Sequence, residues 1–127
     1  MKTVMAFGSF DHVHEGHRYY LSEAKKLGTL TVVVARDINI QKFKEFTPKY
    51  SETERVEHVK ELGIADHVIL GHEQDIYEVV EEVKPDIIAM GYDQRPADEV
   101  VEKELEKRGL SISIVRIKGY KEDQYKS

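Results

Sequence analysis

Short apolar runs alternate with segments of helical periodicity along the whole chain, and this alternation constrains the fold more than any other feature. The runs typical of buried strands cover residues 4–7, 30–35, 67–70, 86–90 and 111–117. The helical segments lie between them, at about residues 16–27, 51–62, 75–83 and 96–108. Because parallel strands need long crossover connections, the order strand–helix–strand predicts a doubly wound parallel sheet.

Glycines and a capping motif stand where this alternation predicts the ends of helices. Gly28, Gly63 and Gly109 stand where the predicted helices should end, and Ser51–Glu54 has the spacing of a capping box. The 127 residues contain no internal repeat and no linker-like stretch, so we expect one domain over residues 1–127. The predicted fold class is therefore α/β, Rossmann-like, with five parallel strands. Residues 38–50 give the least clear pattern, and a short helix followed by a loop is expected there.

The composition narrows the classes of partner. The chain has a net charge of −5, which argues against broad nucleic-acid binding, since that needs a basic face. It has no cysteine, which excludes a disulfide and a thiolate metal site. No apolar run approaches membrane-spanning length and no signal peptide is visible, so we expect a cytoplasmic protein without a membrane partner.

The segment from Gly8 to His17 is the strongest functional signal. It follows a buried strand, breaks at a glycine and opens into a helix, which is the local architecture that holds phosphate on backbone N–H groups. His14 and His17 are three residues apart and fall on one face of the first helical turn, so both rings can reach one phosphate. A metal site formed with His12 is a weaker alternative, because this spacing supplies no carboxylate.

Polar residues and glycines follow each of the other predicted strands. Because the carboxyl ends of parallel strands share one edge of the sheet, these residues are expected to lie beside the segment from Gly8 to His17, the predicted phosphate loop. Ordinary surface loops would show similar polarity, so the pattern alone does not establish a site. The segments are Arg36-Asp37, Gly71-His72, Gly91-Tyr92-Asp93-Gln94 and Arg116-Ile117-Lys118-Gly119.

These motifs resemble those of a known family. Gly8-Ser9-Phe10-Asp11 followed by His14-x-Gly16-His17 is similar to the signature of the cytidylyltransferase-like nucleotidyltransferases. Residues 62–71, 84–94 and 105–121 resemble the archaeal-type FAD synthetases in particular, and the glycerol-3-phosphate cytidylyltransferases form the neighbouring branch. The resemblance covers nearly the whole chain.

The resemblance implies a nucleotidyltransferase that moves an AMP or CMP group from ATP or CTP to a phosphorylated acceptor and releases pyrophosphate. FMN is the preferred acceptor, with FAD as the product. Glycerol 3-phosphate or a sugar phosphate, for a lipid, wall or lipopolysaccharide precursor, is an alternative acceptor, and a non-catalytic nucleotide-binding domain is a second alternative. Mg²⁺ brought by the triphosphate and a homodimer are also implied.

The resemblance also assigns roles to residues. His14, His17 and Lys42 are the expected catalytic residues, although Lys44 is an equal candidate by spacing. Asp11 has two open interpretations, as a cap or turn residue or as a direct ligand, and it is the nearest candidate for Mg²⁺. One ring of Tyr19-Tyr20 is expected in the core, with stacking on a base or flavin as the alternative. The residues expected to bind nucleotide or phosphate are Gly8, Ser9, Phe10, Asp11, Gly16, Arg55, Gly91, Asp93, Gln94 and Arg116.

Overall fold

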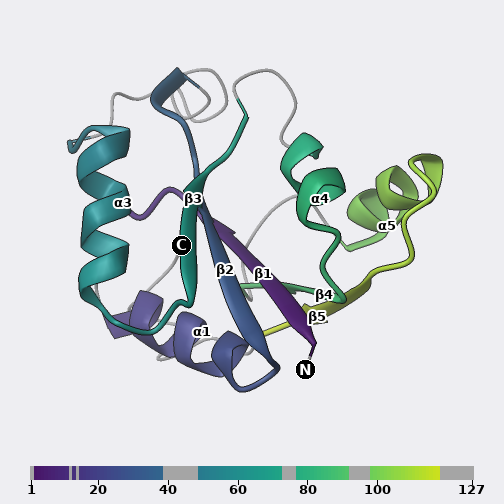
Figure 1. Ribbon diagram of the computed structural model, residues 1–127, viewed down its shortest axis with the longest axis horizontal. Helices are drawn as coiled ribbons and strands as arrows, with labels where there is room; N and C mark the ends of the chain where they lie inside the picture. The colour runs from purple at the N-terminus through teal and green to yellow at the C-terminus, as the bar shows by residue number, and fades with distance from the viewer. Residues whose placement is uncertain are drawn as a thin grey trace.

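The computed structural model describes residues 2–11, 13, 15–38, 49–72, 77–91 and 98–117. Strands and helices alternate through these ranges, as the sequence predicts (Figure 1). In chain order the elements are β1 (Thr3–Gly8), α1 (Glu15–Lys25), β2 (Thr29–Val34), α3 (Glu52–Glu61), β3 (His67–Leu70), α4 (Glu78–Val83), β4 (Ile87–Met90), α5 (Asp98–Lys107) and β5 (Ser113–Arg116).

The five strands form one sheet in the order β3-β2-β1-β4-β5, and every pairing is parallel. The doubly wound fold predicted from the alternation is therefore confirmed. The chain builds one half outward from β1 to β2 and β3, and then returns to the other side of β1 for β4 and β5. The strand order thus reverses between β1 and β4, which is where open α/β sheets bind their ligands.

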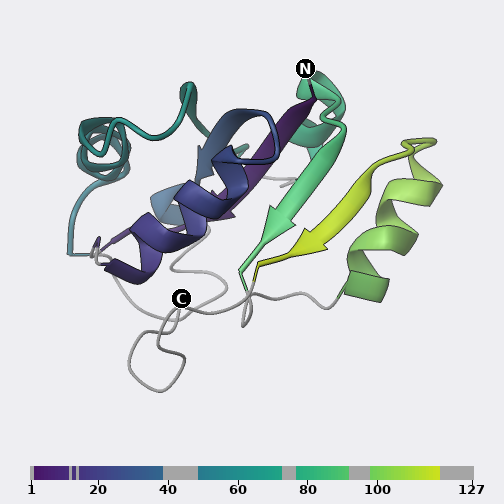
Figure 2. The same ribbon diagram turned by 90° about the horizontal axis from the view of Figure 1, so that it is seen from below.

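Helices cover both faces of the sheet (Figures 1 and 2). Side chains alternate across the sheet, so that Val4 and Ala6 belong to one apolar cluster and Met5 to the other. The first cluster includes Leu21 of α1 and Val59 of α3, whereas the second includes buried residues of α4 and α5. Burial on both faces explains why the strands read as continuous apolar runs.

Local signals set several element ends. Ser51 caps α3, and its hydroxyl accepts from the Glu54 backbone N–H while the Glu54 carboxylate accepts from the Ser51 N–H. A Cβ at Gly28 would lie 2.1 Å from the Lys2 carbonyl oxygen, so the turn between α1 and β2 requires glycine there. None of the helices among the described residues is both long and apolar enough to cross a bilayer.

Candidate active site

A tight loop leaves the carboxyl end of the central strand β1. Phe10 has a left-handed backbone (φ 53°), and its side chain is only 1% exposed. Its ring folds back beneath Gly8, where an added Cβ would lie 2.7 Å from the Phe10 Cε2 atom. Glycine at position 8 therefore allows the close approach that turns the chain from the strand toward α1.

The Phe10 ring also contacts His17 in the first turn of α1. The two ring centroids lie 5.2 Å apart with an interplanar angle of 59°. Gly16 lies in the same first turn of α1, at the end of the helix that carries the positive pole of its dipole. The loop, the helix end and the His17 ring are thus close together, in the arrangement that suits an anion. His12 and His14 lie outside the described residues.

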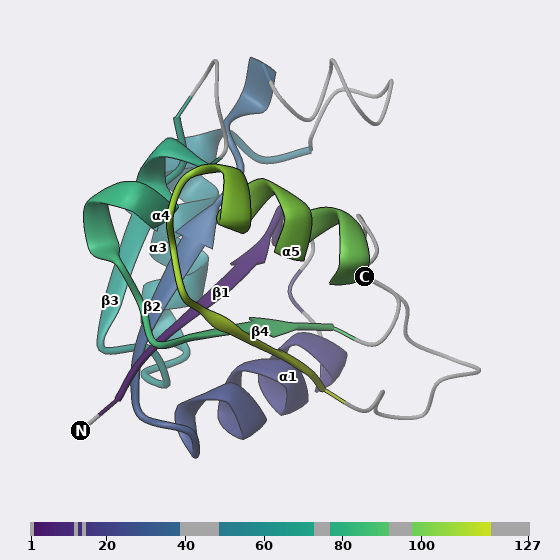
Figure 3. The ribbon, with the colours of Figure 1, turned by 90° about the vertical axis from the view of Figure 1, so that its right-hand side faces the viewer.

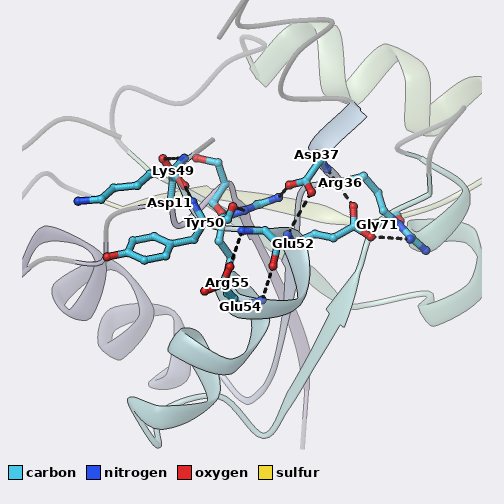
Figure 4. Close-up of polar contacts among 11 residues, drawn as sticks. Asp11, Arg36, Asp37, Lys49, Tyr50, Glu52, Glu54, Arg55 and Gly71 are labelled. Carbon is cyan, nitrogen blue, oxygen red and sulfur yellow. Dashed lines mark hydrogen bonds and ion pairs between the residues drawn. The ribbon is translucent and has the colours of Figure 1, made fainter. Parts of the chain in front are cut away.

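Arg55 joins this loop to two other segments (Figure 4). Its side chain is completely buried, and each of its nitrogens donates one hydrogen bond. Nη1 reaches the Ser9 carbonyl at 2.7 Å, Nη2 reaches the Asp37 carboxylate at 2.6 Å, and Nε reaches the Tyr50 carbonyl at 3.2 Å. The guanidinium therefore connects the loop after β1 to the segment after β2 and to Tyr50, the residue before the N-cap of α3.

Asp11 holds the same segment from the loop side. Its two carboxylate oxygens accept hydrogen bonds from the backbone N–H groups of Tyr50 (2.9 Å) and Lys49 (3.0 Å). Burial opposes ionisation of Asp11, but these two hydrogen bonds and the charge of Arg55 outweigh it and hold the pKa of the carboxyl below its ordinary value. These partners lie 38 and 39 positions away in the chain, so the bonds are tertiary contacts rather than the local bonds of a turn or helix cap, and both interpretations of Asp11 stay predictions.

A second set of contacts joins the ends of β2 and β3 to the start of α3. Glu52 accepts from Arg36 Nη1 at 2.9 Å and from the Asp37 backbone N–H at 3.0 Å, while its own N–H donates to Asp37 (Figure 4). Arg36 Nε donates to the Gly71 carbonyl at 2.8 Å. The carboxyl ends of β1, β2 and β3 are therefore connected through one polar network.

The ends of β4 and β5 are joined separately. Arg116 Nη1 donates to the Gly91 carbonyl, so the side chain at the end of β5 closes over the end of β4. The described part of the site therefore has two halves. One is formed by the ends of β1, β2 and β3 with the loop and α1, the other by the ends of β4 and β5, and the reversal of strand order separates them.

The structure brings most of the described candidates to one edge of the sheet, as the sequence predicts. Gly8, Ser9, Phe10, Asp11, Gly16 and His17 lie at or next to the phosphate loop, and Gly91 and Arg116 lie across the strand reversal. Arg55 lies beneath the loop rather than on the surface. Lys42, Asp93 and Gln94 lie outside the described residues, and the binding and catalytic roles remain predictions.

Sequence reasoning missed two partners of this network. The sequence predicts for Glu52 only a place in a capping box. In the structure its carboxylate also accepts hydrogen bonds from Arg36 and from the Asp37 backbone N–H. Tyr50 lies in the part of the sequence with the least clear pattern. Its backbone N–H donates to Asp11, and its carbonyl accepts from Arg55. Acidic side chains at the start of a predicted helix, opposite an arginine after a strand, were the available signal for Glu52.

The fold and the loop define an α/β protein with a candidate anion site at the reversal of strand order. The sequence profile of the cytidylyltransferase-like family matches residues 5–127, and the chain belongs to this family. It is 48% identical to a FAD synthase of Methanosarcina barkeri over 118 residues, which cover 92% of this chain and 84% of the relative. A FAD synthase of Aciduliprofundum boonei is 46% identical over 94% of this chain and 80% of its own length.

Solved structures agree on the fold. A protein of Thermoplasma volcanium described as a lipopolysaccharide core biosynthesis protein superposes with a TM-score of 0.89 at 45% identity, over 94% of this chain and 98% of its own. The pantoate-β-alanine ligase of Francisella tularensis, complexed with an ATP analogue, gives a TM-score of 0.66 at 11% identity, over 92% of this chain and 59% of its own. This second likeness concerns the fold alone.

Proposed function

We propose that this protein is a nucleotidyltransferase that transfers AMP from ATP to FMN and so forms FAD and pyrophosphate. The observation that carries the proposal is the 48% identity to a curated FAD synthase across 92% of this chain. The strand β1 and the helix α1 flank the loop, and this strand–loop–helix order supports the proposal because it is the local architecture that binds phosphate in other proteins.

In this reaction an oxygen of the FMN phosphate attacks the α-phosphorus of ATP. The new P–O bond forms as the bond between the α-phosphorus and the bridging oxygen breaks, and pyrophosphate leaves. Most of the acceleration then comes from positioning and from stabilisation of the developing negative charge. The backbone N–H groups of the loop at Ser9 and Phe10, together with His14, His17 and Lys42, supply those donors in our proposal.

Mg²⁺ enters this proposal with the triphosphate rather than as a resident ion. The described residues contain no group of three or more potential metal ligands. Asp11, the nearest carboxylate in the loop, already accepts backbone hydrogen bonds on both oxygens. This engagement fits a cation held mainly by phosphate oxygens and water, which is common for Mg²⁺ in nucleotide sites. The ion would supply charge neutralisation on the phosphates.

A second candidate has its own support. The Thermoplasma volcanium protein, at 45% identity over nearly the whole of both chains, is described by a role in lipopolysaccharide core biosynthesis. That description fits transfer of a nucleotidyl group to a sugar phosphate by the same loop and the same displacement. The two candidates therefore differ in the acceptor and share the chemistry.

A substrate panel separates these candidates. Purified protein is mixed with ATP or CTP, and with FMN, glycerol 3-phosphate or a hexose 1-phosphate, and pyrophosphate release is measured. We expect pyrophosphate release with ATP and FMN, and we expect the variant His17→Ala to lose this release. Release only with the sugar phosphate or glycerol 3-phosphate would support the second candidate. Nucleotide binding without pyrophosphate in any combination would support a non-catalytic domain.

Two further expectations accompany the proposal. A homodimer is our prediction for the assembly, and light scattering coupled to size-exclusion chromatography tests it by mass. A cytoplasmic location is our prediction for the compartment, and cell fractionation tests it. Neither bears on the chemistry of the loop.

A further inference from the structure

The pairing of the two central strands ends earlier than the pairing on either side of them. The β1–β4 ladder stops at the pair Ala6–Ala89. The β1–β2 ladder continues to the pair Gly8–Val34, and the β4–β5 ladder continues to Met90–Arg116. Figures 1 and 3 show β1 and β4 pointing apart toward their carboxyl ends. The sheet therefore separates into its two halves where the candidate site begins.

A buried tyrosine hydroxyl bridges the strands at this point. Tyr20 of α1 is 6% exposed, and its hydroxyl donates to the Ala89 carbonyl at 2.5 Å. The same oxygen accepts from the Phe7 backbone N–H at 3.3 Å. Burial raises the pKa of Tyr20 well above its ordinary value, so the hydroxyl keeps its proton. One side chain thus holds one backbone group from each strand, that of Ala89 in the last pair and that of Phe7 directly after it.

The neighbouring side chains are small where the Tyr20 ring lies. Ala6 and Ala89, the last pair of the ladder, are completely buried and belong to the same apolar cluster as Tyr20. Two methyl groups side by side leave space on the sheet for an aromatic ring from α1. The ring and its hydroxyl are therefore fixed by packing as well as by hydrogen bonds, and α1 is the helix that carries His17.

We propose that Tyr20 is a positioning residue that sets the separation of β1 and β4, and with it the width of the crevice that a nucleoside triphosphate spans. The inference rests on the proposed function, in which the loop after β1 holds the phosphates, and it adds that the nucleoside extends across the reversal of strand order toward the ends of β4 and β5. A change in this separation moves Gly91 and Arg116 relative to Gly8. Only a ligand that contacts both halves is sensitive to that movement.

The test compares a ligand that spans both halves with a ligand that contacts one. The variant Tyr20→Phe removes the hydroxyl, and binding of ATP and of inorganic tripolyphosphate is measured by calorimetry. We expect the Kd of ATP to rise about tenfold or more while the Kd of tripolyphosphate changes less than about twofold, a difference between the ligands of at least about 1 kcal/mol. In turnover, kcat/KM for ATP should fall at least as much as the affinity.

Two control variants separate this effect from a general loss of stability. Tyr19→Phe removes a hydroxyl from the adjacent position of α1, and Val79→Ala removes buried volume from α4 on the opposite face. We expect both variants to keep the ratio of the two dissociation constants at its wild-type value. An unchanged ATP affinity in Tyr20→Phe, or an equal loss for both ligands, would overturn the inference.

A measurement on the wild-type protein covers the case in which Tyr20→Phe does not fold. Exchange of the Phe7 amide proton, followed by NMR, depends on the bond to Tyr20. ATP, which spans both halves, should slow that exchange, whereas tripolyphosphate should not; equal effects would refute the inference. If the wild type binds no ATP and forms no FAD, the proposed function itself fails. If the wild type forms FAD but ATP and tripolyphosphate do not differ in these measurements, only the inference about Tyr20 fails.

Discussion

Replacing Arg55 by lysine is the most informative perturbation of the site's framework. Lysine keeps the positive charge and most of the length, but its single ammonium replaces a planar group with donors in three directions. In the structure those donors reach Ser9, Asp37 and Tyr50, which belong to three segments far apart in the chain. An ammonium that satisfies one of these acceptors leaves the other two without the partner they have in the wild type.

The size of the effect follows from these contacts. A hydrogen bond to a charged group contributes about 1.5–3 kcal/mol, so losing two bonds costs about 3 kcal/mol at the lower value. The lower value is appropriate because the Asp37 side chain is 36% exposed and water can replace part of its lost interaction. A loss of this size is a large fraction of the 5–15 kcal/mol typical of domain stability. It should lower the Tm by on the order of 10 °C.

Urea unfolding followed by circular dichroism measures this difference by linear extrapolation. The matched control is Arg108→Lys, at an arginine that is 20% exposed and contacts Glu81 and Glu104 near the surface. There the expected loss is below about 1 kcal/mol. The reasoning is refuted if Arg55→Lys loses no more stability than Arg108→Lys.

Three other changes test separate parts of the loop. Gly8→Ala places a Cβ against the Phe10 ring, so the affinity for tripolyphosphate should fall about tenfold or more by calorimetry, and an unchanged affinity would show that the loop tolerates the methyl group. His17→Ala should lower kcat about 100- to 1000-fold in the pyrophosphate assay, and near-normal turnover would remove His17 from the mechanism. Asp11→Asn should destabilise the protein at neutral pH, because the folded-state pKa of Asp11 lies below its ordinary value of 3.8. The ionised carboxylate stabilises the wild type above that pH, and this stabilisation is lost as the pH falls through the folded-state pKa. The difference in urea midpoint between the variant and the wild type should therefore shrink below about pH 4. A difference that stays constant with pH would contradict this reasoning.

The fold followed from the sequence because its signals are local. Buried parallel strands read as apolar runs, and each helix between them carries its own periodicity and end signals. The strand predicted at residues 67–70 has those bounds in the structure, and the capping box at Ser51 begins α3 as expected. The loop at Gly8 was recognisable for the same reason, since its glycine, strand and helix are adjacent in sequence.

The contacts that organise the site were less visible because they join distant residues. Arg55 reaches Ser9 across 46 positions, and Tyr20 reaches Ala89 across 69. A single sequence carries no local pattern for such pairs. The role of Arg55 in nucleotide or phosphate binding stays a prediction, and its buried bonds to other parts of the protein could not be predicted from the sequence. Tyr20 could be placed in the core, but its bond between two strands could not be read from helical periodicity.

The most direct test of the central claim follows the label of ATP into the product. The protein is incubated with FMN and with ATP that carries ³²P at either the α- or the γ-position, and the products are separated by chromatography. We predict that α-label appears in FAD in a one-to-one ratio with released pyrophosphate, and that γ-label appears only in pyrophosphate. Transfer of γ-label to the acceptor, or the absence of α-label from any product, would contradict nucleotidyl transfer at this loop.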